Sequence, residues 1–357
     1  MAEIVPDASF GVPAAPRFAL GIGLTNECNL SCAFCYRDPS RADRLDLQQL
    51  RAVLDRLPVK SVNLGTGENG MHPQFREMLS LLRSQNVQLT MTSNGLSVAL
   101  LTDDDLRAFH DLEFSLDYPT REEQDAQRGP GNWDLVHAQA ARCRRFGVPV
   151  TIVAVMMRTN YRRLAEIANI AARYGAPLRV NVCQSVRTDQ FALTYEQYWE
   201  AFELLFSATD VLAVGEPLVR AMLGLPRGEG GCGARTVRVT PRATVQPCVY
   251  WPGPGDPLSL LLQVGADVVA TPAFRAARSI PRACDPCELR DACGGGCAGR
   301  RQLDKALDRP DRYCPIVRGE RPRLPMRLAP GRDLPKAASA CTTIVMGRSS
   351  AARSTEY

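Results

Sequence analysis

The chain has 357 residues, 45% of them hydrophobic and 23% charged, which is typical of a globular protein with a large core and about two domains. The formal charge is +5, and residues 319–357 supply +4 of it through seven Lys or Arg and three Asp or Glu. Aromatic and basic residues are not interleaved, and no stretch approaches the roughly 20 apolar residues of a membrane span. We therefore expect no nucleic-acid or membrane partner. The N-terminus has no basic region followed by an apolar run, so a cytoplasmic location is expected.

From about residue 18 to residue 185, short apolar runs alternate with amphipathic helical stretches. The strand-like runs are FALGIGLT (18–25), SVNLGTG (61–67), VQLTMTSNG (87–95), LEFSLD (112–117), VTIVAVMM (150–157) and LRVNVC (178–183). Strands alternating with helices predict βαβ units and a parallel sheet. Six such units favour an α/β fold, a partial (β/α)6 TIM-like barrel over residues 18–205. The chemistry of such folds lies at the C-terminal ends of the strands.

The rest of the chain has a different pattern. Residues 206–231 are expected to link the barrel to a small cysteine-rich domain over residues 232–318, where turns and short strands replace the βα units. Residues 1–17 are expected to form an N-terminal extension. Residues 319–357 are rich in Pro, Arg, Ala and Ser with little periodicity, so a disordered basic tail is expected there.

Thirteen cysteines in a cytoplasmic chain require an explanation. Disulfides are disfavoured in a reducing compartment, so metal binding or catalysis is favoured. Three cysteines lie within residues 28–35, and seven lie between residues 232 and 314. Of the other three, Cys143 has helical spacing with apolar neighbours and is expected in the core. Cys341, in the predicted tail, is expected to be incidental.

The sequence NECNLSCAFCY places Cys28, Cys32 and Cys35 on the loop after the first predicted strand, and Phe34 and Tyr36 flank the last cysteine. Three thiolates are one fewer than a tetrahedral zinc or a cysteine-bound iron–sulfur cluster normally uses. The residues alone leave two options. One is a structural metal with a distant fourth ligand, and the other is a cluster with one iron open to a small molecule.

The C-x3-C-x2-C spacing and its aromatic neighbours resemble the radical S-adenosylmethionine (SAM) enzymes. The resemblance implies a [4Fe–4S] cluster on the three cysteines, with the amino and carboxylate groups of SAM on the fourth iron. It also implies that Phe34 and Tyr36 border this cosubstrate.

Further polar residues follow the predicted strands in the order that this resemblance implies. GTGE (65–68) resembles the Gly-Gly-Glu motif, in which Gly65 and Gly67 would let the backbone approach the ligand and Glu68 would bind the methionine ammonium. Thr66 departs from that motif. The other cosubstrate contacts implied are Asn94, Ser115, Asp117, Arg128, expected at the carboxylate, and Asn181, expected at the ribose. Each polar residue alone is also compatible with a turn or a cap.

The later cysteines follow C-x15-C, then C-x2-C-x5-C-x3-C, then a single cysteine. Four of them alone would suit a zinc ion, but seven are one short of two such sites. The ordered set resembles the SPASM extension of radical SAM enzymes, which carries two auxiliary iron–sulfur clusters, although Ala243 replaces a usual glycine. The distal cluster would be held by Cys284, Cys287, Cys293 and Cys314. The nearer cluster would be held by Cys232, Cys248 and Cys297, with a fourth site open to substrate, water or a non-cysteine ligand.

Cys183 follows Asn181 by two residues, so both side chains are expected on the same face of the sixth strand, toward the barrel interior. A thiol in that position could donate a hydrogen atom to a substrate radical. The alternative is a small buried residue without a chemical role.

The resemblance covers residues 18–318 and implies an enzyme that cleaves SAM to a 5′-deoxyadenosyl radical and abstracts hydrogen from a substrate. Our first hypothesis is oxidative modification of a ribosomal peptide, by cross-linking or dehydrogenation. One alternative is a dehydrogenase or epimerase of a small molecule such as a sugar or an aminocyclitol. The other is a non-catalytic iron–sulfur electron carrier, which would not need GTGE or Arg128.

The same resemblance implies a reducing partner of the flavodoxin or ferredoxin type. Only about 17 residues precede the predicted barrel, so a separate protein that binds the leader peptide is expected if the substrate is a ribosomal peptide.

Overall fold

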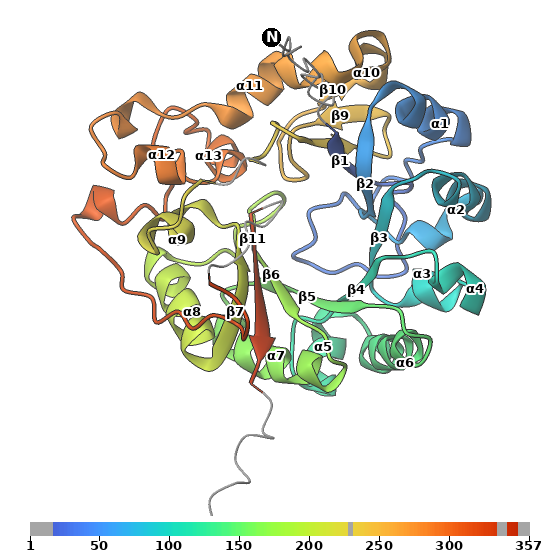
Figure 1. The fold of residues 1–357 in the computed structure, drawn as a ribbon, viewed down its shortest axis with the longest axis horizontal. Coiled ribbons are helices and arrows are strands. Elements are labelled where there is room, and N and C mark those ends of the chain that lie inside the picture. Colours follow the sequence, from blue (N-terminus) through green and yellow to red (C-terminus); the bar gives the residue numbers. More distant parts are fainter. Residues whose placement is uncertain (1–16, 228–230, 334–340, 349–357) are drawn as a thin grey trace, which may run out of the picture.

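A computed structural model describes residues 17–227, 231–333 and 341–348 (Figure 1). Except for Arg17, the predicted N-terminal extension lies outside these residues. The first six strands are parallel neighbours in chain order: β1 (Phe18–Ile22), β2 (Val59–Leu64), β3 (Gln88–Ser93), β4 (Asp111–Ser115), β5 (Val150–Met156) and β6 (Leu178–Val182). The predicted α/β partial barrel is therefore confirmed, with its strands where the apolar runs place them.

Helices cover the outer face of this sheet (Figure 1). They are α1 (Leu47–Arg56), α2 (Phe75–Arg83), α3 (Leu96–Ala99), α4 (Asp103–Leu106), α5 (Arg121–Arg128), α6 (Asn132–Arg145), α7 (Leu164–Arg173) and α8 (Tyr195–Ala208). Local signals set their starts, as at α1, where Asp46 and Gln49 form a capping box. The outward side chains of the strands, such as Val62 and Leu64, are fully buried under the helices. The core of the protein therefore lies between sheet and helices.

Beyond β1, the sheet continues into the cysteine-rich region. Strand β8 (Thr236–Val239) pairs in parallel with β1, and β9 (Thr244–Gln246) and β10 (Asp256–Pro257) extend the edge in antiparallel fashion. Ala243, in the turn between β8 and β9, has φ 53°, a left-handed conformation that favours glycine. The remaining helices are α9 (Pro217–Met222), α10 (Leu258–Val264), α11 (Pro272–Arg278), α12 (Arg290–Cys293) and α13 (Ala298–Leu303).

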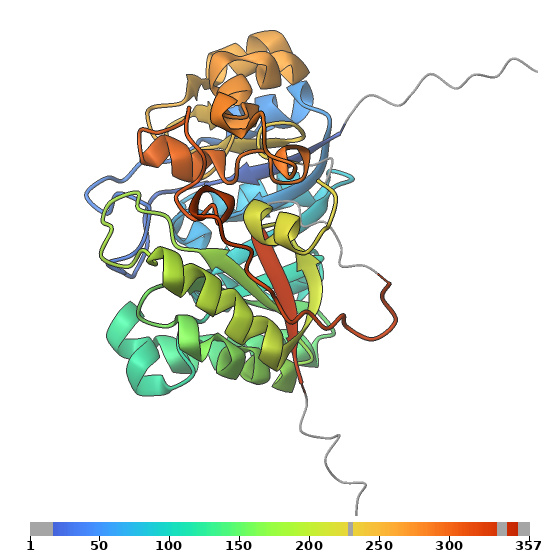
Figure 2. The same ribbon diagram turned by 90° about the vertical axis from the view of Figure 1, so that its left-hand side faces the viewer.

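At the other edge, the prediction of a disordered tail is wrong for the residues that the structure describes. Thr342–Gly347 form β11, which lies between β6 and β7 (Thr209–Val214) and is antiparallel to both (Figures 1 and 2). Leu328 forms a bridge with Val211, so the segment before β11 also packs on the barrel. The physical reason is the run TTIVM, whose β-branched side chains suit a central strand. Residues 334–340 and 349–357 of the predicted tail lie outside the described residues.

One helical stretch, Leu258–Arg278, is long and apolar enough by composition to be a candidate membrane span. The stretch is not one continuous helix, because a 3-10 segment over Gly265–Ala270 separates α10 from α11. Arg56 of α1 donates to the carbonyls of Leu262 and Gln263 at 2.7 and 2.8 Å. A membrane span needs about 20 continuous helical residues, so this stretch fits an outer layer of the fold better.

A buried ion network joins the cysteine-rich region to the barrel. The Arg300 guanidinium, in α13, lies 2.8 Å from the Glu216 carboxylate and 2.6 Å from the Asp311 carboxylate. It also stacks over the rings of Tyr198 in α8 and Tyr313, at 5.6 and 4.8 Å. The network therefore fixes α13 against the barrel from two sides.

Strand β11 predicts a large effect of a charge at its centre. Val345 is 0% exposed, whereas Val317 is 68% exposed. We expect Val345→Asp to lower the free energy of unfolding by about 4 kcal/mol or more, because it buries an unpaired carboxylate. Val317→Asp is the matched control and should change it by less than about 0.5 kcal/mol. Denaturant unfolding measures both, and equal values would contradict the central position of β11.

Candidate active site and cluster-binding cysteines

The interior of the barrel is a cavity of about 910 Å³. Its wall consists of inward side chains at period two along the strands, which are mostly polar, such as Asn63, Thr90, Thr92, Glu113 and Arg179. The cavity is bordered by all three cysteines of the N-terminal group and by several cysteines of the C-terminal region. Residues more than 200 positions apart in sequence therefore share one interior space.

The loop from residue 25 to residue 44 carries Cys28, Cys32 and Cys35. The Cys28 sulfur accepts the Leu30 N–H at 3.4 Å and the Asn94 Nδ2–H at 3.5 Å, and the Cys35 N–H donates to the Cys32 carbonyl at 3.1 Å. All three line the cavity at the C-terminal end of β1. Three sulfurs on one wall, with amide donors beside one of them, fit a cysteine-bound iron–sulfur cluster.

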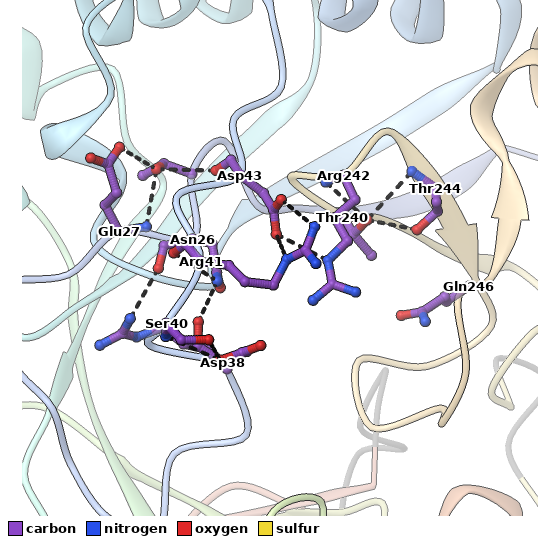
Figure 3. Close-up of polar contacts among 12 residues, drawn as sticks. Asn26, Glu27, Asp38, Ser40, Arg41, Asp43, Thr240, Arg242, Thr244 and Gln246 are labelled. Atoms are coloured by element: carbon purple, nitrogen blue, oxygen red, sulfur yellow. Dashed lines mark hydrogen bonds and ion pairs between the residues drawn. The ribbon is translucent and has the colours of Figure 1, made fainter.

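Polar contacts close this loop on itself and on the cysteine-rich region (Figure 3). The Asn26 N–H donates to the Asp43 carbonyl at 2.9 Å, and Asn26 Nδ2 donates to the Asp38 carbonyl at 2.6 Å. The Asp43 carboxylate pairs with Arg41 at 2.8 Å and with Arg242, between β8 and β9, at 3.0 Å. The N-terminal cysteine loop is thus positioned by both parts of the chain.

Burial keeps the thiols of Cys28 and Cys32 protonated while no metal is bound. It raises the pKa of Cys28 to about 11, and it also raises the pKa of Cys32, although the charge of Arg128 opposes the second shift. Because only the thiolate binds iron, cluster assembly must release these protons.

Residues 65–68 form a tight turn after β2, where Gly67 has φ 62°. A Cβ at Gly67 would collide with the carbonyl oxygens of Glu27 and Thr25, the latter at 2.5 Å. This glycine therefore lets the turn pack against the cysteine loop. It also lines the cavity, so its predicted role in ligand approach stays a prediction. Gly65 lines the cavity as expected.

Thr66, the departure from the glycine motif, has φ 75°, which is uncommon for a β-branched residue. Its hydroxyl lies 2.9 Å from that of Tyr36 and also accepts a hydrogen bond from Arg238 of β8. Tyr36 in turn packs edge-on against Tyr250, at 5.5 Å between ring centroids. The Thr66 side chain thus links the cysteine loop to the cysteine-rich region.

Glu68 borders the cavity, but its carboxylate is already hydrogen-bonded. It accepts from the Ser93 hydroxyl, from the Asn94 N–H at 3.0 Å and from the Ser97 N–H at 2.7 Å. A carboxylate has about four acceptor positions, so one remains for an ammonium group. The predicted contact with SAM stays a prediction, and a structural role of Glu68 in joining β2 to β3 is added to it.

Asp117 and Arg128 form a buried ion pair at 2.7 Å. Asp117 also accepts the Val155 N–H at 2.8 Å, and its side chain is not part of the cavity wall. Arg128 does line the cavity, with its guanidinium 5.3 Å from the Phe34 ring centroid. The structure therefore places Asp117 behind Arg128, as a residue that orients it, and not in contact with the cavity.

The remaining predicted residues of this group lie on the cavity wall. Ser115 ends β4, and Asn181 in β6 pairs in register with Thr342 of β11. Cys183 lines the same cavity, as strand parity predicts, among Tyr118, Met157 and Phe191. Burial raises the pKa of Cys183 to about 12, so it is a neutral thiol at neutral pH. Its role as a hydrogen donor stays a prediction.

The four cysteines predicted to hold the distal cluster lie close together. Burial raises the pKa of Cys284 to about 11, and the neighbouring Cys293, Cys314 and Cys287 contribute to the shift. The Gly295 N–H donates to the Cys293 sulfur at 3.3 Å. This grouping agrees with the predicted ligand set.

The three cysteines predicted to hold the nearer cluster also lie together, beside the barrel cavity. Cys232 contacts Cys248, and a Cβ at Gly299 would lie 3.5 Å from the Cys248 sulfur and 3.9 Å from the Cys297 sulfur. The Cys341 sulfur is 4.0 Å from that of Cys232. The expectation that Cys341 is incidental is therefore wrong, because β11 brings it to the other cysteines of this group.

No group of three or more His, Cys, Asp or Glu side chains is arranged to hold a single metal ion, within the part of the chain that the structure describes.

Several cavity residues were missed by the sequence analysis. Glu113 and Arg179 form an ion pair inside the barrel, where Glu113 also accepts the Thr92 hydroxyl. Burial, assisted by the charge of Glu113, raises the pKa of Asp111 to about 7. The alternation of polar and apolar residues along each strand could have revealed them. Because helices cover the apolar outer face of the sheet, the polar face must point into the barrel.

The fold is a partial barrel whose interior cavity is lined by cysteines from distant parts of the chain. The family model for the radical SAM superfamily matches residues 22–171. The chain is 29% identical to the mycofactocin maturase MftC of Mycobacterium tuberculosis over 319 residues, 82% of this chain and 81% of that protein. It is 27% identical to the PqqA peptide cyclase of Gluconobacter oxydans over 327 residues, 79% of this chain and 86% of the other.

Among solved structures, Streptococcus suis SuiB bound to precursor peptide SuiA matches with a TM-score of 0.63 and 16% identity, over 84% of this chain and 76% of that one. This likeness concerns the fold. The family model identifies a radical SAM domain over residues 22–171, and the sequence matches extend over about 80% of the chain. The family implies a [4Fe–4S] cluster and SAM binding, and Cys28, Cys32 and Cys35 are the residues that fit this cluster.

The Gly67 turn gives a test of how the cysteine loop is held. Gly67→Ala should destabilise the protein by about 1–3 kcal/mol more than Gly175→Ala, because both glycines have positive φ but only Gly67 faces backbone atoms. Gly67→Ala should also lower the iron bound after anaerobic reconstitution, while Gly175→Ala should not. Equal unfolding energies and equal iron would contradict the packing role.

Glu68 can be tested by SAM affinity. Glu68→Gln should weaken binding by about 1.5–3 kcal/mol, the usual size of a charge-assisted hydrogen bond, as measured by calorimetry under anaerobic conditions. Ser93→Ala removes one donor to the same carboxylate and serves as the control for its structural role. If both variants bind SAM as the natural protein does, Glu68 is structural alone.

Proposed function

We propose that this protein is a radical SAM maturase that oxidatively modifies a ribosomally made peptide, by a cross-link or a dehydrogenation. The relatives at 27–29% identity, a mycofactocin maturase and a PqqA peptide cyclase, support a peptide substrate. The bound precursor peptide of SuiB is consistent with a fold that accepts one.

The observation that carries this proposal is the shared cavity. Its wall includes Cys28, Cys32 and Cys35 from the N-terminal group, and Cys232, Cys248 and Cys297 from the C-terminal group. A substrate in this cavity would lie between a site of hydrogen abstraction and a second site that can take up an electron. That arrangement suits an oxidation, in which the substrate loses one hydrogen atom and then one electron and one proton.

When bound and reduced, the [4Fe–4S] cluster supplies the electron that cleaves SAM, and the resulting 5′-deoxyadenosyl radical abstracts a hydrogen atom. The chain's own residues would orient the cosubstrate. Arg128, held by Asp117, would bind the carboxylate, and Glu68 would accept from the ammonium. Phe34 and Tyr36 would exclude water from one side of the site.

We propose two auxiliary iron–sulfur clusters, on Cys284, Cys287, Cys293 and Cys314 and on the nearer cysteine group. A flavodoxin or ferredoxin would supply the reducing electron, a separate protein would present the leader peptide, and the enzyme would act in the cytoplasm.

A second candidate is the oxidation or epimerisation of a small polar molecule such as a sugar or an aminocyclitol. The polar floor of the cavity favours it, because Glu113, Arg179 and Asn63 offer charged and neutral hydrogen-bonding groups. The relatives favour the peptide, which we therefore place first.

Anaerobic incubation with SAM, a reductant and candidate precursor peptides tests the proposal. We expect 5′-deoxyadenosine and a peptide two hydrogens lighter, detected by mass spectrometry, with no deuterium from deuterated water. The variant with Cys28, Cys32 and Cys35 all replaced by Ala should form neither product. Formation of 5′-deoxyadenosine without any change in peptide mass would agree with radical SAM activity but would reject the peptide as substrate.

The fate of the substrate radical depends on Cys183 only if the enzyme epimerises. In that case the product should carry one deuterium from solvent, and Cys183→Ala should stop turnover after hydrogen abstraction. Because Cys183 is buried in the cavity wall, Cys143→Ala, which removes a buried thiol from α6, is the matched control. A lighter product formed equally by Cys183→Ala would exclude the donor role.

A further inference from the structure

The position of Cys341 is unexplained by the three-cysteine ligand set. Its sulfur lies 4.0 Å from that of Cys232, and it also contacts the thiol of Cys297. Cys232 in turn contacts Cys248. Four cysteines that are up to 109 positions apart in sequence thus form one group, and all four border the barrel cavity.

The backbone holds Cys341 firmly in this place. The next residue, Thr342, begins β11 and pairs in register with Asn181 of β6. The Thr342 carbonyl accepts the Gly215 N–H at 2.7 Å, just beyond the end of β7. Cys341 is therefore placed by hydrogen bonds to two strands of the barrel and not by a chance approach of a loose segment.

A buried cation lies beside the same group. Arg220, in α9, is 8% exposed, donates to the Ala292 carbonyl at 3.4 Å and lies near Cys341, Cys293 and Glu216. Its Nε–H has no hydrogen-bond partner in the described parts of the chain. A buried guanidinium with an unpaired N–H is costly, so the position favours further negative charge nearby. A cluster with four thiolate ligands is anionic and would supply that charge.

We propose that Cys341 is the fourth ligand of the nearer auxiliary cluster, together with Cys232, Cys248 and Cys297. Four cysteines are the usual ligand set of a [4Fe–4S] cluster. On binding, the Cys341 thiol loses its proton to solvent and its sulfur bonds to the fourth iron. This inference rests on the nearer cluster of the proposed function, and it replaces the open fourth site that the sequence analysis expected.

The consequence for the reaction is specific. A cluster with all four irons bound to cysteine has no position for substrate, so the substrate would be oxidised by electron transfer across the cavity wall without bonding to this iron. Gly299 leaves space on one side, where a Cβ would contact the sulfurs of Cys248 and Cys297. The space beside the sulfurs is therefore available to the cluster itself.

The test uses the full chain with Cys28, Cys32 and Cys35 replaced by Ala, because the first cluster has an open iron. After anaerobic reconstitution and reduction, ¹³C-cyanide is added, and electron–nuclear double resonance detects carbon bound to iron. We expect no ¹³C coupling in this background. Adding Cys341→Ala should produce the coupling or remove the iron of one cluster, whereas the control Cys143→Ala should do neither.

Other outcomes overturn the proposal. A ¹³C coupling with Cys341 intact would show an open iron, and an unchanged spectrum and iron content after Cys341→Ala would show that Cys341 is no ligand. If Cys341→Ala does not fold, Cys341→Ser keeps a ligand of similar size. The electron paramagnetic resonance spectrum of its reduced cluster should then show g values that differ from those of the starting background. Loss of all iron from the starting background would reject the auxiliary clusters as well, whereas failure to modify a peptide would concern only the proposed function.

Discussion

The structure depends on one buried cation, the guanidinium of Arg300. It is shared by Glu216, at the barrel side of α9, and Asp311, near the last cysteine of the distal group. Removing one member of such a buried network typically costs about 3–5 kcal/mol, because it leaves an uncompensated charge. Asp311 also accepts the Cys297 N–H at 2.8 Å, so the network that joins the two regions also fixes the position of a cysteine beside the cavity.

This constraint explains how one cavity can be bordered by distant parts of the chain. The parallel strands bring the N-terminal cysteine loop, Arg128 and Cys183 to one end of the barrel, and the Arg300 network holds the second cysteine group against that end. The barrel interior is polar where most cores are apolar, and the apolar packing lies outside, between sheet and helices. Among the described residues, Asp111 and Arg179 have buried side-chain atoms without hydrogen-bond partners, a cost in stability that is expected where a substrate is to be bound.

Much of this arrangement follows from local sequence patterns. The six strands and the cysteine groups were predictable because strand periodicity and ligand spacing are short-range signals. The pairing of Asp117 with Arg128 was not predictable, because the order of motifs gives the strand ends but not which side chains pair there. Cys341 and β11 were missed because the composition of residues 319–357 hid the short run TTIVM, and no local signal says that this run pairs with strands about 130 and 160 residues earlier. Arg300, Glu216 and Asp311 belong to the same class of long-range contact.

The insertion of β11 between β6 and β7 also bears on synthesis. The ribosome completes the first six strands and β7 long before residues 342–347. During that interval β11 is missing from its place between β6 and β7, and each of these two strands has an unpaired edge. Exposed edges of this kind are templates for association with other chains. The nascent protein therefore passes through a stage that favours aggregation or chaperone binding, and this stage ends only when the last strand enters the sheet.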